Sequence, residues 1–270
     1  MKKEIEELIL NGYTIIENVL SDSLVNSIST AFDRISKNYE LNFDNNKINE
    51  NEYGTIRCIL SLDDIFLSLI EVEKVDKFAR ECMGSYNHYS FTGLYTSKDF
   101  IHPTTYFHRD LPVFVSGNIL SLNVLYILDD TNSKNGATWI LPRSHTFLSR
   151  PTENYINKNK LQLTAKSGSV IIFNSLTYHA AGINYSGLPR RSITNLFRRP
   201  FMKQQFQWES ALKSSTIKKL SENQKSLLGF YNGPAKSIDE YHAEGIRRRE
   251  FRKIMGIETK NGIQIENSNY

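Results

Sequence analysis

The residues His108-Arg109-Asp110 place an imidazole and a carboxylate two positions apart in the chain. In a strand or at its end, residues i and i+2 point to the same side, so both side chains can converge on one metal ion. One further imidazole completes a set of two histidines and one carboxylate, which leaves coordination positions open for oxygen and substrate. The pattern predicts a redox iron site.

Three histidines downstream, His145, His179 and His242, are the candidates for the third ligand. His179 comes shortly after the apolar run 170–173, which has the composition of a buried strand. A residue in that position can lie at the rim of a strand that neighbours the His108 segment. We therefore favour His179.

Arg190 follows His179 by eleven residues and opens the segment 190–198, which is rich in strand-forming residues. A guanidinium can hold a carboxylate through two parallel hydrogen bonds, which a lysine cannot reproduce. Arg190 is thus a candidate anchor for the distal carboxylate of 2-oxoglutarate; the alternative is a solvated charge. Arg191 is expected to point to the opposite face of the strand.

Four further residues are candidates for the pocket. Asn123 interrupts the apolar run 119–128, so it either satisfies a hydrogen bond in the core or reaches into the pocket, and we interpret it as cofactor-binding. Tyr95, Lys98 and Tyr106 belong to segments that lead toward His108, and they are candidates to line the substrate site.

The elements that must position these residues change character near residue 86. Before it, apolar residues at helical spacing predict helices over 3–10, from Ser21 or Asp22 onward, and over 64–82, with one short strand at 13–16 and a loop over 42–52. After it, aromatic and β-branched runs between turn signals predict strands. These are 86–96, 104–108, 117–128, 137–141, 161–165, 169–174, 177–180 and 190–198.

Helices are expected again after Pro200, the last over 237–255. This order predicts a mainly β fold with flanking helices, a double-stranded β-helix of the jelly-roll or cupin type. We expect a single domain over 1–270, with the β-helix core at about 86–200 and helical flanks over 1–85 and 201–270.

Composition limits the classes of protein to consider. The 270 residues are 40% hydrophobic and 23% charged, and the net charge of +4 is too small to argue for nucleic acid. The N-terminal segment resembles no signal peptide, and no apolar stretch is long enough to span a bilayer. Two cysteines without metal spacing are expected to be reduced thiols. We expect a cytoplasmic protein with a small-molecule substrate and no nucleic-acid or membrane partner; oligomeric state stays open.

Three segments resemble the phytanoyl-CoA dioxygenase family of Fe(II)- and 2-oxoglutarate-dependent oxygenases. Residues 11–20 (NGYTIIENVL) resemble the family's N-terminal opening, and residues 135–145 (NGATWILPRSH) its Asn-Gly to Ser-His segment. Residues 168–173 (GSVIIF) resemble the strand before the family's distal histidine. One departure is Arg143, where the family usually has glycine.

The resemblance implies that His108, Asp110 and His179 bind iron and that Arg190 anchors 2-oxoglutarate. It further implies that O2 is consumed, 2-oxoglutarate is decarboxylated to succinate and CO2, and a small organic molecule is hydroxylated. Because Asp110 is present, oxygenation is favoured over halogenation. His145 is then expected to have a structural role in a turn.

Alternative functions follow from the same residues. A jelly-roll protein can bind the metal without oxygenase activity, and the same site can carry out desaturation, cyclisation or epimerisation. A protein kinase is excluded, although His-Arg-Asp-Leu also begins a kinase catalytic loop. That loop needs asparagine five residues after the aspartate, where this chain has Val115.

Overall fold

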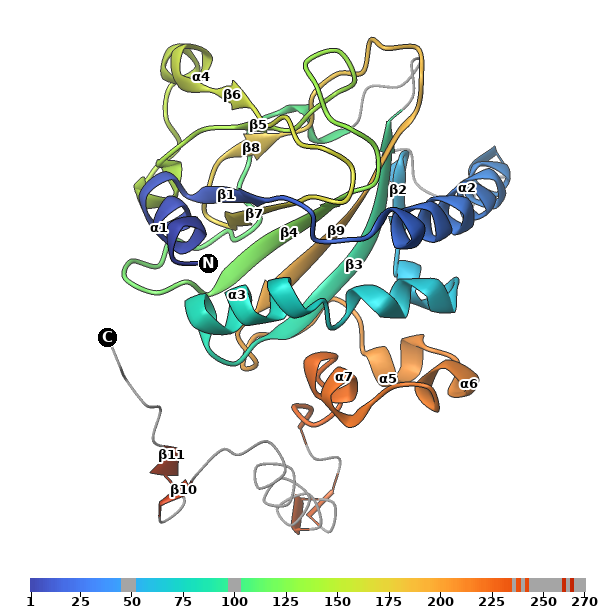
Figure 1. Ribbon diagram of the computed structural model, residues 1–270. Helices are drawn as coiled ribbons and strands as arrows, with labels where there is room; N and C mark the ends of the chain where they lie inside the picture. Colours follow the sequence, from blue (N-terminus) through green and yellow to red (C-terminus); the bar gives the residue numbers. More distant parts are fainter. Residues whose placement is uncertain are drawn as a thin grey trace.

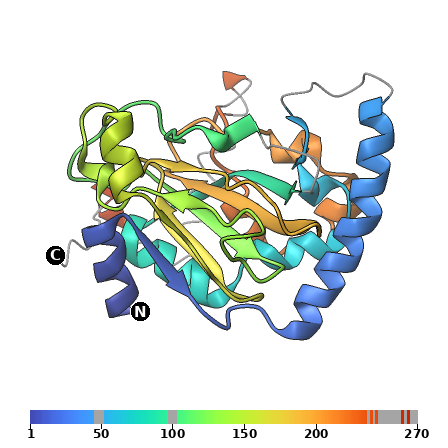
Figure 2. The same ribbon diagram turned by 90° about the horizontal axis from the view of Figure 1, so that it is seen from above.

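The computed structural model describes residues 1–44, 52–96 and 103–234, together with the pairs 237–238, 241–242, 259–260 and 263–264. The chain begins with helix α1 (Lys2–Asn11), strand β1 (Tyr13–Ile16) and helix α2 (Asp22–Asp44), all of which the sequence predicted. Helices α1 and α2 lie at opposite ends of the strands (Figures 1 and 2).

A tight joint at Gly12 connects α1 to β1. Gly12 adopts φ +84°, a left-handed conformation that favours glycine, and its N–H donates to the carbonyl of Leu8. Its own carbonyl accepts from the N–H of Asn174 at 2.9 Å and from the hydroxyl of Thr177 at 3.0 Å. The joint is thereby attached to the chain just before His179.

Six strands form the large sheet, and every neighbouring pair is antiparallel. Their order is β1-β7-β4-β9-β3-β2. Besides β1 the sheet contains β2 (Thr55–Arg57), β3 (Asn87–Thr96), β4 (Ser121–Ile127), β7 (Val170–Asn174) and β9 (Arg190–Arg198).

A small sheet of three short strands lies across from part of the large sheet (Figure 1). Its order is β6-β5-β8, and its strands are β5 (Trp139–Ile140), β6 (Leu161–Gln162) and β8 (His179–Ala180). Ile140 and Leu163 on this side pack against Leu125, Ile171 and Phe173 of the large sheet. Two facing antiparallel sheets with flanking helices confirm the predicted jelly-roll class.

The other face of the large sheet packs against helices and forms the main core. Alternate residues of β4, among them Val124 and Tyr126, lie in one cluster with Phe32 of α2 and Phe78 of helix α3 (Glu73–Met83). Since β4 is buried on both faces, its alternation separates core residues from those that face the interior between the sheets.

Two predicted elements differ from the structure, and the strand β2 was missed. Instead of one helix over 64–82 there are a 3-10 helix, η3 (Asp64–Leu69), and then α3, because Val72 is extended and begins the second helix. The helical spacing of apolar residues in the sequence continues across the break, because both helices pack against the same core. Residues 104–108 are no strand: η4 (Pro103–Thr105) precedes a single bridge from His108 to His179. Strand β2 had not been predicted, and three residues are too short to show alternation.

The remaining described elements are short. They are η2 (Ile59–Ser61), η5 (Ser144–Thr146), α4 (Glu153–Asn159), α5 (Trp208–Ala211), α6 (Ser214–Ile217), α7 (Glu222–Leu227), β10 (Thr259–Lys260) and β11 (Ile263–Gln264). Most of the helix predicted over 237–255 lies outside the described residues. Of the helices in the described part of the chain, none has the length and apolar character needed to cross a bilayer.

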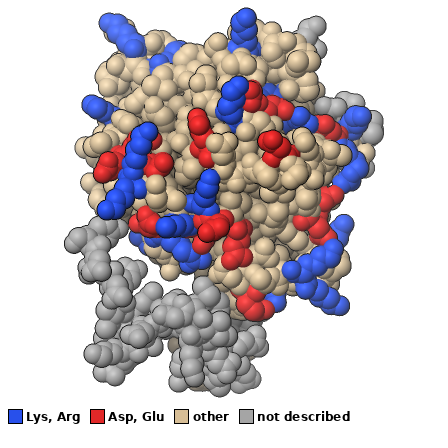
Figure 3. All heavy atoms as spheres, viewed as in Figure 1, with Lys and Arg blue, Asp and Glu red and all other residues tan. Residues whose placement is uncertain are grey.

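Charged side chains of both signs alternate over the molecular face seen in Figure 3. Lysine and arginine stand beside aspartate and glutamate on that face, without a broad region of one sign. On this face the described residues therefore form no continuous basic track of the kind that binds a phosphate backbone.

Candidate metal centre and cosubstrate pocket

His108, Asp110 and His179 come together in the folded chain. Each offers one ligand atom, and these three atoms all lie within 4.8 Å of one another. The Nε2 of His108 is 3.7 Å from Oδ1 of Asp110, and the Nε2 of His179 is 3.6 Å from Oδ2 of the same carboxylate. Two imidazole nitrogens and a carboxylate on one side of a point form the facial set that suits Fe(II).

The two histidines are held by the same pattern of backbone hydrogen bonds. Their backbones form a reciprocal bridge, with His108 N to His179 O at 3.0 Å and His179 N to His108 O at 3.1 Å. Each Nδ1 contacts the carbonyl two residues earlier at 3.0 Å, Tyr106 O for His108 and Thr177 O for His179. Because a carbonyl only accepts, each Nδ1 carries the proton, and each Nε2 keeps its lone pair for a metal.

The carboxylate of Asp110 is oriented by a relay of two polar side chains. Asn123 Nδ2 donates to Asp110 Oδ2 at 2.6 Å, and the Thr194 hydroxyl donates to Asn123 Oδ1 at 2.7 Å. Asn123 also lines the pocket, together with Leu125 two residues on, so of the two possibilities that the sequence left open it reaches the pocket. The contact that Asn123 makes in the structure is with a candidate ligand.

Arg109 points away from the metal centre and holds the segment between the two ligands in place. Its Nε donates to Leu176 O at 2.8 Å and its Nη2 to Ser144 O at 2.9 Å and to Phe147 O. The guanidinium also lies 4.3 Å from the centre of the Tyr178 ring. Sequence reasoning missed this role, although strand alternation places the middle residue of His-x-Asp on the side opposite the ligands.

A cavity of about 320 Å³ opens over the three candidate ligands, between the sheets. This volume lies within the range of small-molecule sites. The inward residues of β3 and β9 supply most of its polar wall. From β9 these are Arg190, Ser192, Thr194 and Arg198, and from β3 they are Tyr89, Ser90, Thr92 and Thr96.

Arg190 lies in this cavity wall and has hydrogen-bond donors without an acceptor among the described residues. Its side chain is 4% exposed, and its Nε and Nη1 have no hydrogen-bond partner among the described residues. Burial lowers the pKa of Arg190 to about 10, against a small opposing effect of Asp129, so the guanidinium remains protonated at neutral pH. A buried, unpaired cation is costly, and a carboxylate supplied by a ligand would satisfy it.

Arg191 provides the contrast on the opposite face. Its backbone N–H, Nε and Nη2 all donate to the carboxylate of Asp129, at 2.6 to 2.9 Å, and Nη1 donates to Asp33 at 2.8 Å. The two neighbouring arginines therefore differ: Arg191 is fully paired within the protein, whereas Arg190 has two buried nitrogens without a hydrogen-bond partner among the described residues.

Burial also keeps the candidate histidine ligand His179 neutral. Desolvation lowers the pKa of His179, the negative charge of Asp110 opposes this effect, and the nearby His108 adds to it. A lowered pKa leaves the imidazole uncharged at neutral pH, which is the form that coordinates a metal.

The two tyrosines predicted for the substrate site do not line the cavity. Tyr95 is buried in the main core, edge-on to Phe32, and it is not among the lining residues, because the even-numbered residues of this part of β3 face the cavity. Tyr106 stands beside the His108 ring but is 64% exposed and outside the lining. Lys98 lies outside the described residues. His145 contacts Ile9 O through Nε2, as a structural role would require.

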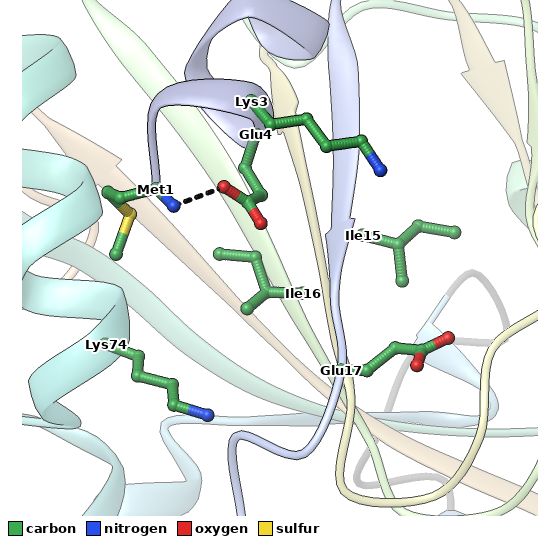
Figure 4. Close-up of a pocket in the computed structure, with 7 residues that line it drawn as sticks. All are labelled: Met1, Lys3, Glu4, Ile15, Ile16, Glu17 and Lys74. Carbon is green, nitrogen blue, oxygen red and sulfur yellow. Dashed lines mark ion pairs between the residues drawn. The ribbon is translucent and has the colours of Figure 1, made fainter.

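A second hollow lies between α1, β1 and Lys74 of α3 (Figure 4). Its volume is about 440 Å³, larger than that of the first cavity. Three of its charged groups have partners within the protein, because the N-terminal ammonium pairs with Glu4 at 2.5 Å and Lys74 donates to Asn18 O. None of the clusters of potential metal ligands in the described chain lies there, so we assign the chemistry to the cavity over His108, Asp110 and His179.

Known protein families and proteins match most of the chain. The model of the phytanoyl-CoA dioxygenase (PhyH) family matches residues 9–192. An uncharacterized protein of Mycobacterium tuberculosis is 28% identical over 253 residues, which cover 91% of this chain and 92% of that protein.

Solved structures share the fold at low sequence identity. EctD from S. alaskensis, with 2-oxoglutarate and 5-hydroxyectoine, has a TM-score of 0.63 and 18% identity over 74% of this chain and 76% of its own. The α-ketoglutarate-dependent epimerase SnoN from nogalamycin biosynthesis has a TM-score of 0.60 and 16% identity over 74% and 83%. Because the family match spans well over half of the sequence and includes the His-Asp-His cluster and Arg190, the chain belongs to the phytanoyl-CoA dioxygenase family.

Proposed function

We propose that this protein is an Fe(II)- and 2-oxoglutarate-dependent dioxygenase that hydroxylates a small organic molecule. His108, Asp110 and His179 are the iron ligands, and Arg190 binds the distal carboxylate of 2-oxoglutarate. The observation that carries the proposal is a pair of nitrogens on buried Arg190 that have no partner among the described residues, in the same cavity as three convergent side chains that could hold a metal ion. The family and the fold agree with it.

The protein's own residues have distinct tasks in this proposal. The carbonyls of Tyr106 and Thr177 fix the protons on Nδ1 of the two histidines, and Asn123 holds the carboxylate of Asp110. When bound, iron and 2-oxoglutarate supply the oxidising chemistry, in which O2 gives one oxygen atom to succinate and one to the product. The surrounding sheets position the substrate and limit the access of water.

The experiment that tests this function measures succinate release from 2-oxoglutarate with Fe(II) and O2, over a panel of small organic molecules. A hydroxylase yields one succinate for each product that has gained one oxygen atom by mass spectrometry. Absence of succinate with every compound, from protein shown to contain iron, would favour a metal-binding protein without oxygenase activity.

Epimerisation is the second candidate, because SnoN, a structural neighbour, is an epimerase. It would consume the cosubstrate but leave the mass of the product equal to that of the substrate. The mass of the product therefore distinguishes the two reactions on the same sample.

A further inference from the structure

The inward face of β9 carries two arginines, one on each side of the candidate metal centre. Arg190 and Arg198 are the first and last residues of the strand, and both line the cavity. They are eight residues apart, or about 26 Å along an extended strand. Thr194 lies midway and reaches Asp110 through Asn123, so the metal ligands lie between the two guanidinium groups.

Arg198 is supported by the protein but not neutralised by it. Its guanidinium lies 3.5 Å from the centre of the Tyr89 ring, and its Nη2 donates only a long 3.4 Å contact to Asp110 O. Its Nε is buried and has no hydrogen-bond partner among the described residues. Within that part of the chain no ion pair involves Arg198.

A bulge in β3 places the Tyr89 ring against the guanidinium of Arg198. The register between β3 and β9 shifts between His88 and Ser90, which leaves Tyr89 as the extra residue of a bulge. As a result Tyr89 and Ser90 both line the cavity, although they are consecutive. Bulges re-aim side chains beside active sites in this way.

When the charges of the lining residues and the proposed cofactors are added, one positive charge has no negative partner. Among the described lining residues the only acid is Asp110, and the cations are Arg57, Arg190 and Arg198. Fe(II), Asp110, 2-oxoglutarate and Arg190 contribute +2, −1, −2 and +1, which sum to zero. Arg57 is paired with Glu52 through two contacts of 2.6 and 3.1 Å. Arg198 remains.

We propose that Arg198, stacked on Tyr89, is a substrate-binding residue that holds the carboxylate of a small organic acid. This assignment rests on the proposed oxygenase function for its meaning as a substrate site. A planar guanidinium fixed on an aromatic ring is preorganised to bind a carboxylate, and this places the remainder of the acid on the metal side of the arginine. Arg190 is already taken by the cosubstrate, so the two carboxylates do not compete.

The test uses fluorine NMR on the full-length protein loaded with redox-inert Zn(II) and saturating 2-oxoglutarate. The probes are 4-fluorobenzoate, 4-fluorophenylacetate and 4,4,4-trifluorobutanoate, each compared with its uncharged primary amide. We expect at least one acid to bind about tenfold more tightly than its amide, and Arg198→Gln to remove that preference. Arg199→Gln, which removes the same charge one residue on and outside the lining, should leave it intact.

Equal binding of acids and amides across the panel would overturn the proposal, as would an unchanged preference in folded Arg198→Gln. If Arg198→Gln does not fold by circular dichroism, Arg198→Lys and Tyr89→Leu replace it. Both variants should weaken binding of the acid several-fold and leave binding of the amide unchanged. An undiminished preference for the acid in both variants would also overturn the proposal.

A second arm separates this proposal from the oxygenase function. In an Arg190→Gln background the competing guanidinium is absent, so the probes report on Arg198 without 2-oxoglutarate. If wild-type protein fails to bind 2-oxoglutarate while this variant still prefers acids, the oxygenase proposal fails and the anion site stands. If 2-oxoglutarate binds and the preference is missing, the anion site alone fails.

Discussion

Arg190 and Arg191 are adjacent, but they have different surroundings because strand alternation places them on opposite faces of β9. Arg191 meets two carboxylates of the protein, whereas Arg190 enters a cavity with unpaired donors. The difference gives the proposed cosubstrate site a variant and a matched control one residue apart.

Arg190→Gln should raise the dissociation constant for 2-oxoglutarate at least tenfold, because it removes a charge-assisted double hydrogen bond. Metal affinity without 2-oxoglutarate should change little, since Arg190 touches none of the ligands. Isothermal titration of metal and of 2-oxoglutarate in separate experiments measures both. Arg191→Gln should lower thermal stability and leave 2-oxoglutarate binding nearly unchanged; the reverse pattern would contradict the assignment.

Asn123 is the residue through which the sheet orients the carboxylate of Asp110, a proposed metal ligand. Asn123→Ala should weaken metal binding by about tenfold to a hundredfold, the usual effect of removing a partner that orients a ligand. Chelator competition measures this. Thr194→Val, one step further from the metal, should have the same direction and a smaller effect. A larger loss from Thr194→Val than from Asn123→Ala would show that the relay does not act in this order.

At the scale of elements, the segment with His108 and Asp110 forms no part of a regular strand. It is held by one reciprocal bridge to β8, by the N–H groups of Asp110 and Leu111, which both donate to Ser175 O, and by the contacts of Arg109 to the chain near residues 144–147 and 176. These contacts replace the ladder of hydrogen bonds that a strand would have provided.

Arg109→Ala should therefore destabilise the protein by about 2–4 kcal/mol, since it leaves several carbonyls without donors and removes a ring contact. Urea unfolding gives the free energy, and metal titration should show weaker binding in the same variant. Arg109→Lys retains the charge but cannot reach the same carbonyls together, so it should recover only part of the loss. Unchanged stability in Arg109→Ala would mean that the segment is held in another way.

Local patterns predicted most elements and the candidate ligands, for physical reasons that also explain the failures. Alternation of two residues brought His108 and Asp110 to one side and separated Arg190 from Arg191. Alternation alone does not show which face of β3 points into the cavity. Tyr95 was therefore predicted to line the pocket, whereas it lies in the core. The missed Arg198 has the same parity as Arg190 on one strand, and that parity was the available signal.

At the scale of the whole molecule, His88 connects the large sheet to the helices on its outer face. Its Nε2 donates to Ile70 O at 2.9 Å, and its Nδ1 accepts from Asn195 Nδ2 at 2.9 Å. Its backbone carbonyl accepts from the indole of Trp208 at 3.0 Å. Complete burial lowers the pKa of His88 to about 4 from the ordinary 6.5.

His88 predicts how stability depends on pH. The unfolded chain takes up a proton near the ordinary value of 6.5, while the folded chain does not until about 4. Stability should hold above 6.5 and fall as pH decreases from 6.5 toward 4, by up to about 1.4 kcal/mol per pH unit from this group. Urea unfolding between pH 5 and 7 measures the slope. His88→Gln should flatten it, and an identical slope in that variant would assign the effect to other groups.

The joint at Gly12 lies outside the cavity lining but is bonded to Thr177, two residues before His179. A β-carbon there would lie 2.5 Å from Nδ1 of His145 and 2.7 Å from the hydroxyl of Thr177, whose carbonyl fixes the ring of His179. A mutational scan scored by turnover should therefore rank residue 12 beside the proposed iron ligands, although it does not line the cavity. Inherited changes at this glycine would then mimic the loss of a ligand, and a survey confined to the cavity would overlook them.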